Sequence, residues 1–170
     1  MDEATRQMAD GLRQAMAAER TGYEFYTLAA KTTQDLEGKA TFEHLAQEEQ
    51  EHFEFLRTHY KALTEHGKLA EGVKLSQKRS VKGDSPIFSA SLRERLKGAH
   101  FEMSALAIAV QLELNGIKHY TEQAKAAPTP EARKFYEELV AWENGHYEAL
   151  LRQQQLLQED YWRDNGFEPF

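Results

Sequence analysis

The sequence contains no cysteine. This absence excludes disulfide bonds, iron–sulfur clusters, thiolate zinc sites and thiol nucleophiles, because each of them needs a cysteine sulfur. Any metal ion that the chain binds must therefore be held by oxygen and nitrogen atoms. Proline is also scarce, with four residues, and glycine accounts for ten of the 170 residues. Alanine, glutamate, glutamine, leucine, lysine and arginine dominate instead, and this balance predicts an all-α protein.

Long apolar runs are missing as well. No segment reaches the roughly 20 apolar residues of a membrane span, and the first residues, MDEATRQMADGLRQ, contain neither a basic leader nor an apolar secretion core. We therefore expect no membrane partner and a cytoplasmic location. The formal net charge of −7 also argues against a nucleic-acid partner, since binding to phosphates needs clustered lysine and arginine.

The length of 170 residues and the hydrophobic content of 41% suit a single domain that spans residues 1–170. Apolar residues recur at helical spacing in four segments, at 3–33, 39–66, 90–126 and 130–159. The joints TTQDLEG and AAPTPEA are so short that each helix pair must form an antiparallel hairpin. We interpret the polar segment 67–89 between the hairpins as a long crossover connection, although its length alone permits either direction for the next helix. We expect Ile87 and Phe88 to pin its end to the bundle. The predicted fold is an antiparallel four-helix bundle.

The two hairpins are copies of each other at an offset of 94 residues. At this offset the first helix and the third share Leu12/Leu106, Glu19/Glu113, Gly22/Gly116, Tyr26/Tyr120, Thr27/Thr121, Ala30/Ala124 and Lys31/Lys125. The second helix and the fourth share Leu45/Leu139, Glu49/Glu143, His52/His146, Glu54/Glu148 and Leu56/Leu150. One register aligns both pairs of helices, which indicates a duplication.

Carboxylates and imidazoles interrupt the apolar stripe of each helix. In the second helix Glu49 and His52 stand between Leu45 and Leu56, and the fourth helix repeats the pattern. Glu19 interrupts the stripe of the first helix in the same way, as its copy does in the third. A buried unpaired carboxylate costs several kcal/mol or takes up a proton, and the corresponding core positions hold no arginine or lysine. Four such carboxylates therefore need a cation.

Hairpin geometry predicts that these groups meet. Residues equidistant from a turn face each other, and the midpoint of Glu19 and Glu49 is residue 34, inside the first joint. The midpoint of Glu113 and Glu143 is residue 128, inside the second joint. Each pair therefore lies ~22 Å from its turn, at the ~1.5 Å rise per residue of a helix. That level is near the middle of the bundle.

The Glu-x-x-His spacing places both side chains on one helix face. One such motif is weak evidence, but this chain has two, each paired with an inward glutamate at the same separation of 30 residues. Four carboxylates and two divalent ions give a site near neutrality, and this ligand set suits iron, with manganese or zinc as substitutes. The predicted metal ligands, and the residues on which catalysis depends, are Glu19, Glu49, His52, Glu113, Glu143 and His146.

With these motifs in view, the chain resembles the rubrerythrin-like branch of the ferritin-like superfamily over essentially its whole length. The resemblance is carried by the segments AERTGYEFYTLAA, LAQEEQEHFEFL, LELNGIKHYTEQA and LVAWENGHYEALL. It implies a ferritin-like fold and a di-iron oxidoreductase of oxidative stress, a peroxidase or ferroxidase that reacts with hydrogen peroxide or dioxygen. Tyr26 and Tyr120 match positions where the family places phenols beside the metal ligands, and ordinary core tyrosines are the alternative.

The chain departs from classical rubrerythrins at two points. It has no cysteine for a rubredoxin iron, so an external donor protein must supply the electrons. An additional glutamate of the third helix is replaced by Gly116, whose twin is Gly22. Because glycine within a helix costs about 1 kcal/mol relative to alanine, the pair indicates a need for space, either for peroxide or dioxygen beside the metals or for close helix packing.

Two other functions stay open at this stage. The first is a non-catalytic iron-binding or storage protein, and the second is a metal-free helical interaction module. We expect a small homo-oligomer, a dimer, to which an exposed Trp142 contributes a contact. The remaining histidines have no duplicated partner and are interpreted as surface or rim residues, namely His44, His59, His66, His100 and His119.

Overall fold

The computed structural model describes residues 2–75, 86–94, 99–164 and 166. Its helices are α1 (Glu3–Thr32), α2 (Leu36–His66), α3 (Ala90–Arg93), α4 (His100–Ala126) and α5 (Pro130–Asp164). No strand is present in this part of the chain. None of the helices found there is both long and apolar enough to cross a membrane.

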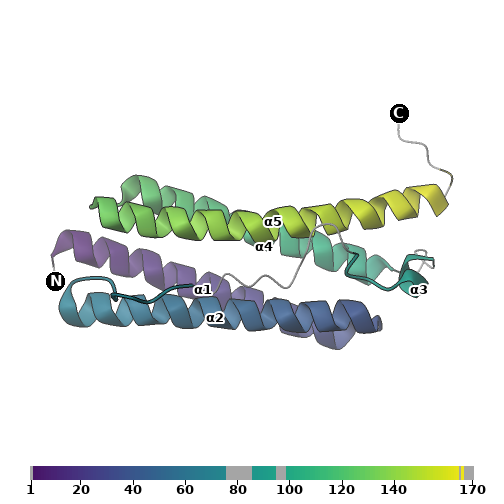
Figure 1. The fold of residues 1–170 in the computed structure, drawn as a ribbon, viewed down its shortest axis with the longest axis horizontal. Coiled ribbons are helices and arrows are strands. Elements are labelled where there is room, and N and C mark those ends of the chain that lie inside the picture. The colour runs from purple at the N-terminus through teal and green to yellow at the C-terminus, as the bar shows by residue number, and fades with distance from the viewer. Residues whose placement is uncertain (1, 76–85, 95–98, 165, 167–170) are drawn as a thin grey trace.

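Two antiparallel hairpins form the molecule, α1 with α2 and α4 with α5, as Figure 1 shows. The hairpins also meet through α1 and α4. The chain leaves α2 at one end of the bundle and resumes with α3 at the other end (Figure 1), as the predicted crossover connection requires. Residues 76–85 of that connection lie outside the described part of the chain.

The third predicted segment, 90–126, is not one helix in the described residues. It comprises the short α3 and the long α4, and residues 95–98 between them lie outside the description. The last helix extends to Asp164 instead of residue 159. The extension has a physical reason, because Asp160 is buried and paired with Arg93 at 2.5 Å and with Arg163 at 2.7 Å. The pair with Arg93 ties the final turns of α5 to α3, and the pair with Arg163 lies within α5.

Two apolar clusters divide the bundle along its length. The first lies toward the α1–α2 turn and is centred on Tyr26, Phe42, Leu45, Leu106 and Leu150. The second lies toward the α4–α5 turn and includes Leu12, Leu56, Tyr120, Tyr136 and Leu139. The interrupting carboxylates and imidazoles fall between the clusters on all four long helices. This arrangement places them near the middle of the bundle.

The end of the crossover connection is pinned as predicted. Ile87 and Phe88 are buried, and the Ile87 backbone N–H donates to Gln153 Oε1 at 3.0 Å. Asp35 caps α2 by accepting from the Gly38 N–H at 2.9 Å, and it also accepts from the Ser89 N–H at 3.1 Å and from the Ser89 hydroxyl. One buried carboxylate therefore joins the first hairpin to the segment that leads into the second.

We predict that Asp35→Ala lowers the free energy of unfolding by about 2–3 kcal/mol, since it removes a helix cap and two further, partly buried hydrogen bonds to Ser89. Asp2→Ala is the matched control, because Asp2 caps α1 through one exposed hydrogen bond, to the Thr5 N–H at 2.8 Å. Chemical denaturation measures both variants. If both variants lost the same small amount of unfolding free energy, the contact between Asp35 and Ser89 would contribute nothing to stability.

Candidate metal centre

The structure buries all six sequence-predicted ligands at one level of the bundle. Their side chains come from four helices, and none is more than 6% exposed, for the set Glu19, Glu49, His52, Glu113, Glu143 and His146. Two groups among them bring ligand atoms within 4.8 Å of one another. These groups overlap in one glutamate, Glu49. The arrangement is therefore one joined cluster.

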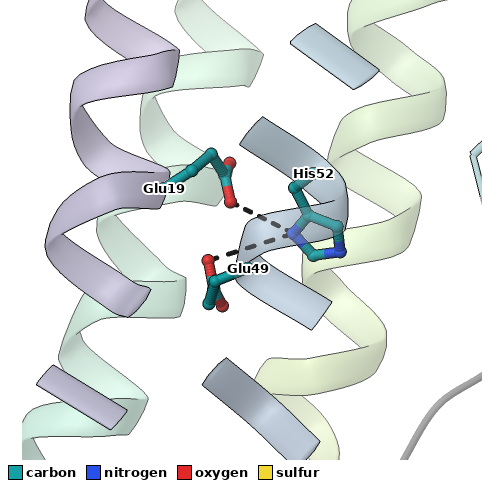
Figure 2. Close-up of side chains that lie close together, drawn as sticks. All are labelled: Glu19, Glu49 and His52. Atoms are coloured by element: carbon teal, nitrogen blue, oxygen red, sulfur yellow. Dashed lines mark hydrogen bonds and ion pairs between the residues drawn. The ribbon is translucent and has the colours of Figure 1, made fainter. Parts of the chain in front are cut away.

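The first group comprises Glu19, Glu49 and His52. Figure 2 shows the two carboxylates converging on the same imidazole nitrogen. The Nδ1 atom of His52 lies 3.1 Å from Glu19 Oε2 and 3.9 Å from Glu49 Oε2. The first hairpin supplies this whole group, because Glu19 belongs to α1 and the other two residues to α2.

The second group comprises Glu49, Glu113 and His146. His146 Nδ1 lies 3.8 Å from Glu113 Oε2, so this histidine also turns Nδ1 toward the carboxylates. The two imidazole rings are 5.8 Å apart between centroids. Glu143 lies outside both groups, but besides burial the nearby carboxylates of Glu19 and Glu113 raise its pKa, so it lies beside them. All four carboxylates therefore belong to one cluster.

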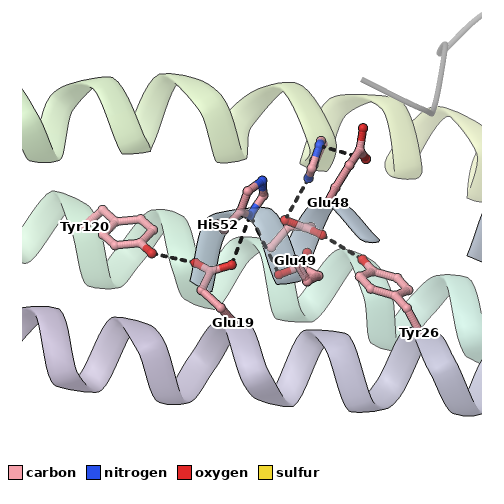
Figure 3. Close-up of polar contacts among 8 residues, drawn as sticks. Glu19, Tyr26, Glu48, Glu49, His52 and Tyr120 are labelled. Atoms are coloured by element: carbon pink, nitrogen blue, oxygen red, sulfur yellow. Dashed lines mark hydrogen bonds and ion pairs between the residues drawn. The ribbon is translucent and has the colours of Figure 1, made fainter. Parts of the chain in front are cut away.

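Two buried tyrosines connect the hairpins through this cluster. The Tyr26 hydroxyl of α1 donates to Glu113 Oε1 of α4 at 2.7 Å, and the Tyr120 hydroxyl of α4 donates to Glu19 Oε1 of α1 at 2.6 Å. Figure 3 shows the two phenols at opposite ends of the cluster. Each hydroxyl fixes one carboxylate oxygen and leaves the other oxygen to face the interior of the site.

Burial sets the electrostatics of the cluster. It raises the pKa of Glu49 and of Glu143 well above the ordinary glutamate value, and the neighbouring Glu19 carboxylate raises both further. Burial also raises the pKa of Glu113. For Glu19 the same burial is outweighed by the hydrogen bond and charge of His52, so its pKa lies below the ordinary value. Without a cation, the cluster must therefore hold protons.

The donor set fits two divalent cations. No lysine or arginine among the described residues forms an ion pair with Glu19, Glu49, Glu113 or Glu143. Within the described part of the chain, the basic groups that pair with them are the two imidazoles, which turn the same ring nitrogen inward. Oxygen and imidazole ligands without sulfur suit iron or manganese. The residues present therefore match a pair of such ions.

The Rubrerythrin family model matches residues 10–154. The chain belongs to the rubrerythrin family. Its all-α, ferritin-like helical bundle is thereby confirmed, and membership supports a di-iron carboxylate protein. No curated protein and no solved structure matches the chain significantly.

Sequence reasoning missed two residues of this rubrerythrin-family site. Glu48 is buried, and its Oε2 lies 3.5 Å from His146 Nε2. Trp142 is only 8% exposed, so the prediction of an exposed residue was wrong. Its ring lies 3.3 Å from the His52 ring and 4.4 Å from the His146 ring, between centroids. The signal was present, because each residue directly precedes a predicted ligand glutamate and the 94-residue offset pairs the two.

The prediction that His59 is a surface or rim residue was also wrong. His59 is 4% exposed and packs between the rings of Phe55 and Phe135, and burial lowers its pKa. It follows His52 by seven residues, two helical turns along the same face, and that spacing is typical of a core position. His119 lies half-buried at the rim, with Nε2 3.2 Å from the Gly11 carbonyl oxygen. The remaining three are exposed, namely His44, His66 and His100.

We predict that the metal-free protein loses stability as the pH rises. Glu49 and Glu143 hold protons in the folded state above the ordinary glutamate pKa of 4.5, because their pKa values are raised. The unfolded chain releases those protons near 4.5, so the folded state binds more protons over this window and its stability falls with pH. The melting temperature of metal-depleted protein, measured from about pH 5 to about pH 8, should decrease.

The double variant Glu49→Gln, Glu143→Gln is the control for this effect. It keeps the shape of the two side chains but has no carboxyl group to ionise at either position, so its melting temperature should vary less over the same range. A wild-type melting temperature that rises with pH would contradict the proton-bound cluster.

Proposed function

We propose that this protein is a di-iron oxidoreductase that reduces hydrogen peroxide, with dioxygen as an alternative oxidant. Iron is the proposed native metal, and manganese or zinc would substitute for it. The observation that carries the proposal is the set of four buried carboxylates that have no lysine or arginine partner among the described residues, in a chain of the rubrerythrin family. Such a set is stable in its ionised form only around cations.

Each half of the cluster would hold one iron. Glu19 and His52 would bind the first ion, and Glu113 and His146 the second. Glu49 belongs to both groups and is therefore the residue best placed to contact both ions. When bound, the two irons supply the two electrons that, with two protons, convert hydrogen peroxide to two molecules of water. An external donor protein would then return two electrons.

The chain's own residues orient the ligands and exclude bulk water. Burial raises the pKa of both phenols well above the ordinary tyrosine value. The nearby Glu113 carboxylate raises the pKa of Tyr26 further, and the nearby Glu19 carboxylate does the same for Tyr120. Both phenols therefore stay protonated and keep donating to the carboxylates. The apolar clusters on either side of the site limit the entry of water along the bundle axis.

A pocket of about 350 Å³ gives small molecules a route to the cluster. It opens between α1 and α4, and its lining includes all four ligand glutamates together with Gly22 and Gly116. Hydrogen peroxide and dioxygen are far smaller than this volume. The pocket supports the hypothesis that the duplicated glycines leave room for the oxidant.

The two glycines are not equivalent, however. A Cβ atom at Gly22 would lie 2.9 Å from Glu49 Oε2, so this glycine makes room for a ligand carboxylate. A Cβ atom at Gly116 would lie 3.5 Å from Glu143 Cδ, an ordinary contact. Close packing therefore accounts for Gly22, whereas Gly116 is the position from which pocket access can be tested.

We predict that Gly116→Leu slows the reaction with peroxide by about tenfold or more while two metal ions still bind, because the added side chain narrows the pocket that leads to the ligands. Gly116→Ala is the matched control and should react nearly as wild type. Stopped-flow spectroscopy with increasing peroxide gives the rate. Equal rates for the Leu and Ala variants would show that peroxide enters elsewhere.

The function is tested on protein produced with iron. Elemental analysis should find two irons per chain, and the anaerobically reduced protein should react faster with hydrogen peroxide than with dioxygen in stopped-flow mixing. The double variant Glu49→Ala, Glu143→Ala should lose iron and reactivity. Iron uptake far beyond two per chain by a large assembly would indicate storage, and a wild-type protein without metal would overturn the proposal.

Three further expectations accompany this proposal. The protein acts in the cytoplasm, it forms a small homo-oligomer, a dimer, and it takes its electrons from a separate protein. Sedimentation of the purified protein measures the second expectation. A cage of about 24 chains would contradict it and would favour storage.

A further inference from the structure

The duplication that builds the site is broken beside each Glu-x-x-His motif. Glu48 directly precedes Glu49, and Trp142 directly precedes Glu143, so the 94-residue offset aligns a carboxylate with an indole. Both side chains are 8% exposed. Each of them reaches across to the histidine of the other hairpin, Glu48 to His146 and Trp142 to His52. The two imidazoles therefore have unlike surroundings.

His146 stands between two carboxylates. Its Nδ1 faces the cluster at 3.8 Å from Glu113 Oε2, and its Nε2 faces Glu48 Oε2 at 3.5 Å. Figure 3 shows Glu48 on the outer side of the cluster, away from the two tyrosines. A carboxylate at Nε2 favours the tautomer that carries its proton there, which leaves the Nδ1 lone pair for a metal ion.

His52 has no such support. Its Nδ1 faces Glu19 and Glu49, but among the described residues no carboxylate forms an ion pair with its buried Nε2, whereas Glu48 pairs with Nε2 of His146. The Trp142 ring covers this histidine at 3.3 Å between centroids. The indole nitrogen is a donor only and cannot accept a proton from an imidazole N–H. Nothing comparable to Glu48 therefore fixes the tautomer of His52.

We propose that Glu48 is a positioning residue that makes the two halves of the centre unequal, so that the His146 half binds a divalent cation before the His52 half. The inference rests on the metal site of the proposed function but not on its peroxide chemistry. Removing an outer carboxylate partner of a metal-binding histidine typically weakens metal binding about 10–100-fold. A difference of this size between the halves separates the two binding steps.

The simplest alternative is that Glu48 only holds α2 against α5. A purely structural role predicts that its loss lowers the melting temperature of the metal-free protein and weakens both binding steps alike. A positioning role predicts a selective loss at one step. The two roles are therefore separated by the shape of a binding curve, without any measurement of activity.

The test is a titration of metal-depleted protein with Co²⁺, which reports its coordination through visible absorption and is stable in air. Calorimetry and absorption should show two steps of one ion per chain in the wild type. Glu48→Gln should weaken the first step about 10–100-fold and bring the steps together. Glu51→Gln is the matched control, because Glu51 is an exposed glutamate on the same helix; it should leave both steps unchanged.

Three further variants assign the steps. His146→Ala should abolish the tight binding step, and His52→Ala should abolish the weak one. Trp142→Glu places a carboxylate at the position that corresponds to Glu48 in the other hairpin, so it should tighten the weak step. Two equal steps in the wild type would overturn this inference and leave the metal site intact. So would identical curves for Glu48→Gln and Glu51→Gln. A wild-type protein that binds no Co²⁺ would overturn the metal site itself.

Discussion

Four glutamates are buried in the middle of an apolar bundle, and no lysine or arginine among the described residues pairs with them. The rest of the site depends on this constraint, because ionised carboxylates at such a place require cations and uncharged ones require protons. Tyr26 and Tyr120 each fix one carboxylate oxygen. Because Gly22 has no side chain, the Glu49 carboxylate can lie against its backbone. These hydrogen bonds and this space therefore accommodate the carboxylates in an apolar interior that disfavours charged groups.

The duplication explains how so many predicted metal ligands reach one level of the bundle. Each hairpin supplies two glutamates and a histidine at matching distances from its own turn, and each contributes one tyrosine that bonds to a glutamate of the other hairpin. Neither hairpin completes the centre alone. The exception to this symmetry is the pair Glu48 and Trp142, which gives the two histidines different neighbours while the six predicted ligands stay matched.

The sequence predicted those features that follow from counting along a helix. The two hairpins and the common level of the ligands are arithmetic consequences of short turns and helical rise, and the structure agrees with them. Features that depend on which side chains are neighbours in space were not predicted. Trp142 and His59 were assigned to the surface, because a large polar aromatic residue at the edge of a stripe fits either face. The unequal glycines were unpredictable for the same reason, since only the position of Glu49 distinguishes them.

The central claim is that six inward-facing side chains hold two metal ions at one level of the bundle. Its most direct test is a crystal structure of protein produced with iron, with anomalous diffraction recorded on both sides of the iron absorption edge. We expect two iron peaks per chain, about 3.5–4 Å apart, bounded by Glu19, Glu49, His52, Glu113, Glu143 and His146. A site without anomalous peaks, or peaks bound by other side chains, would contradict the account.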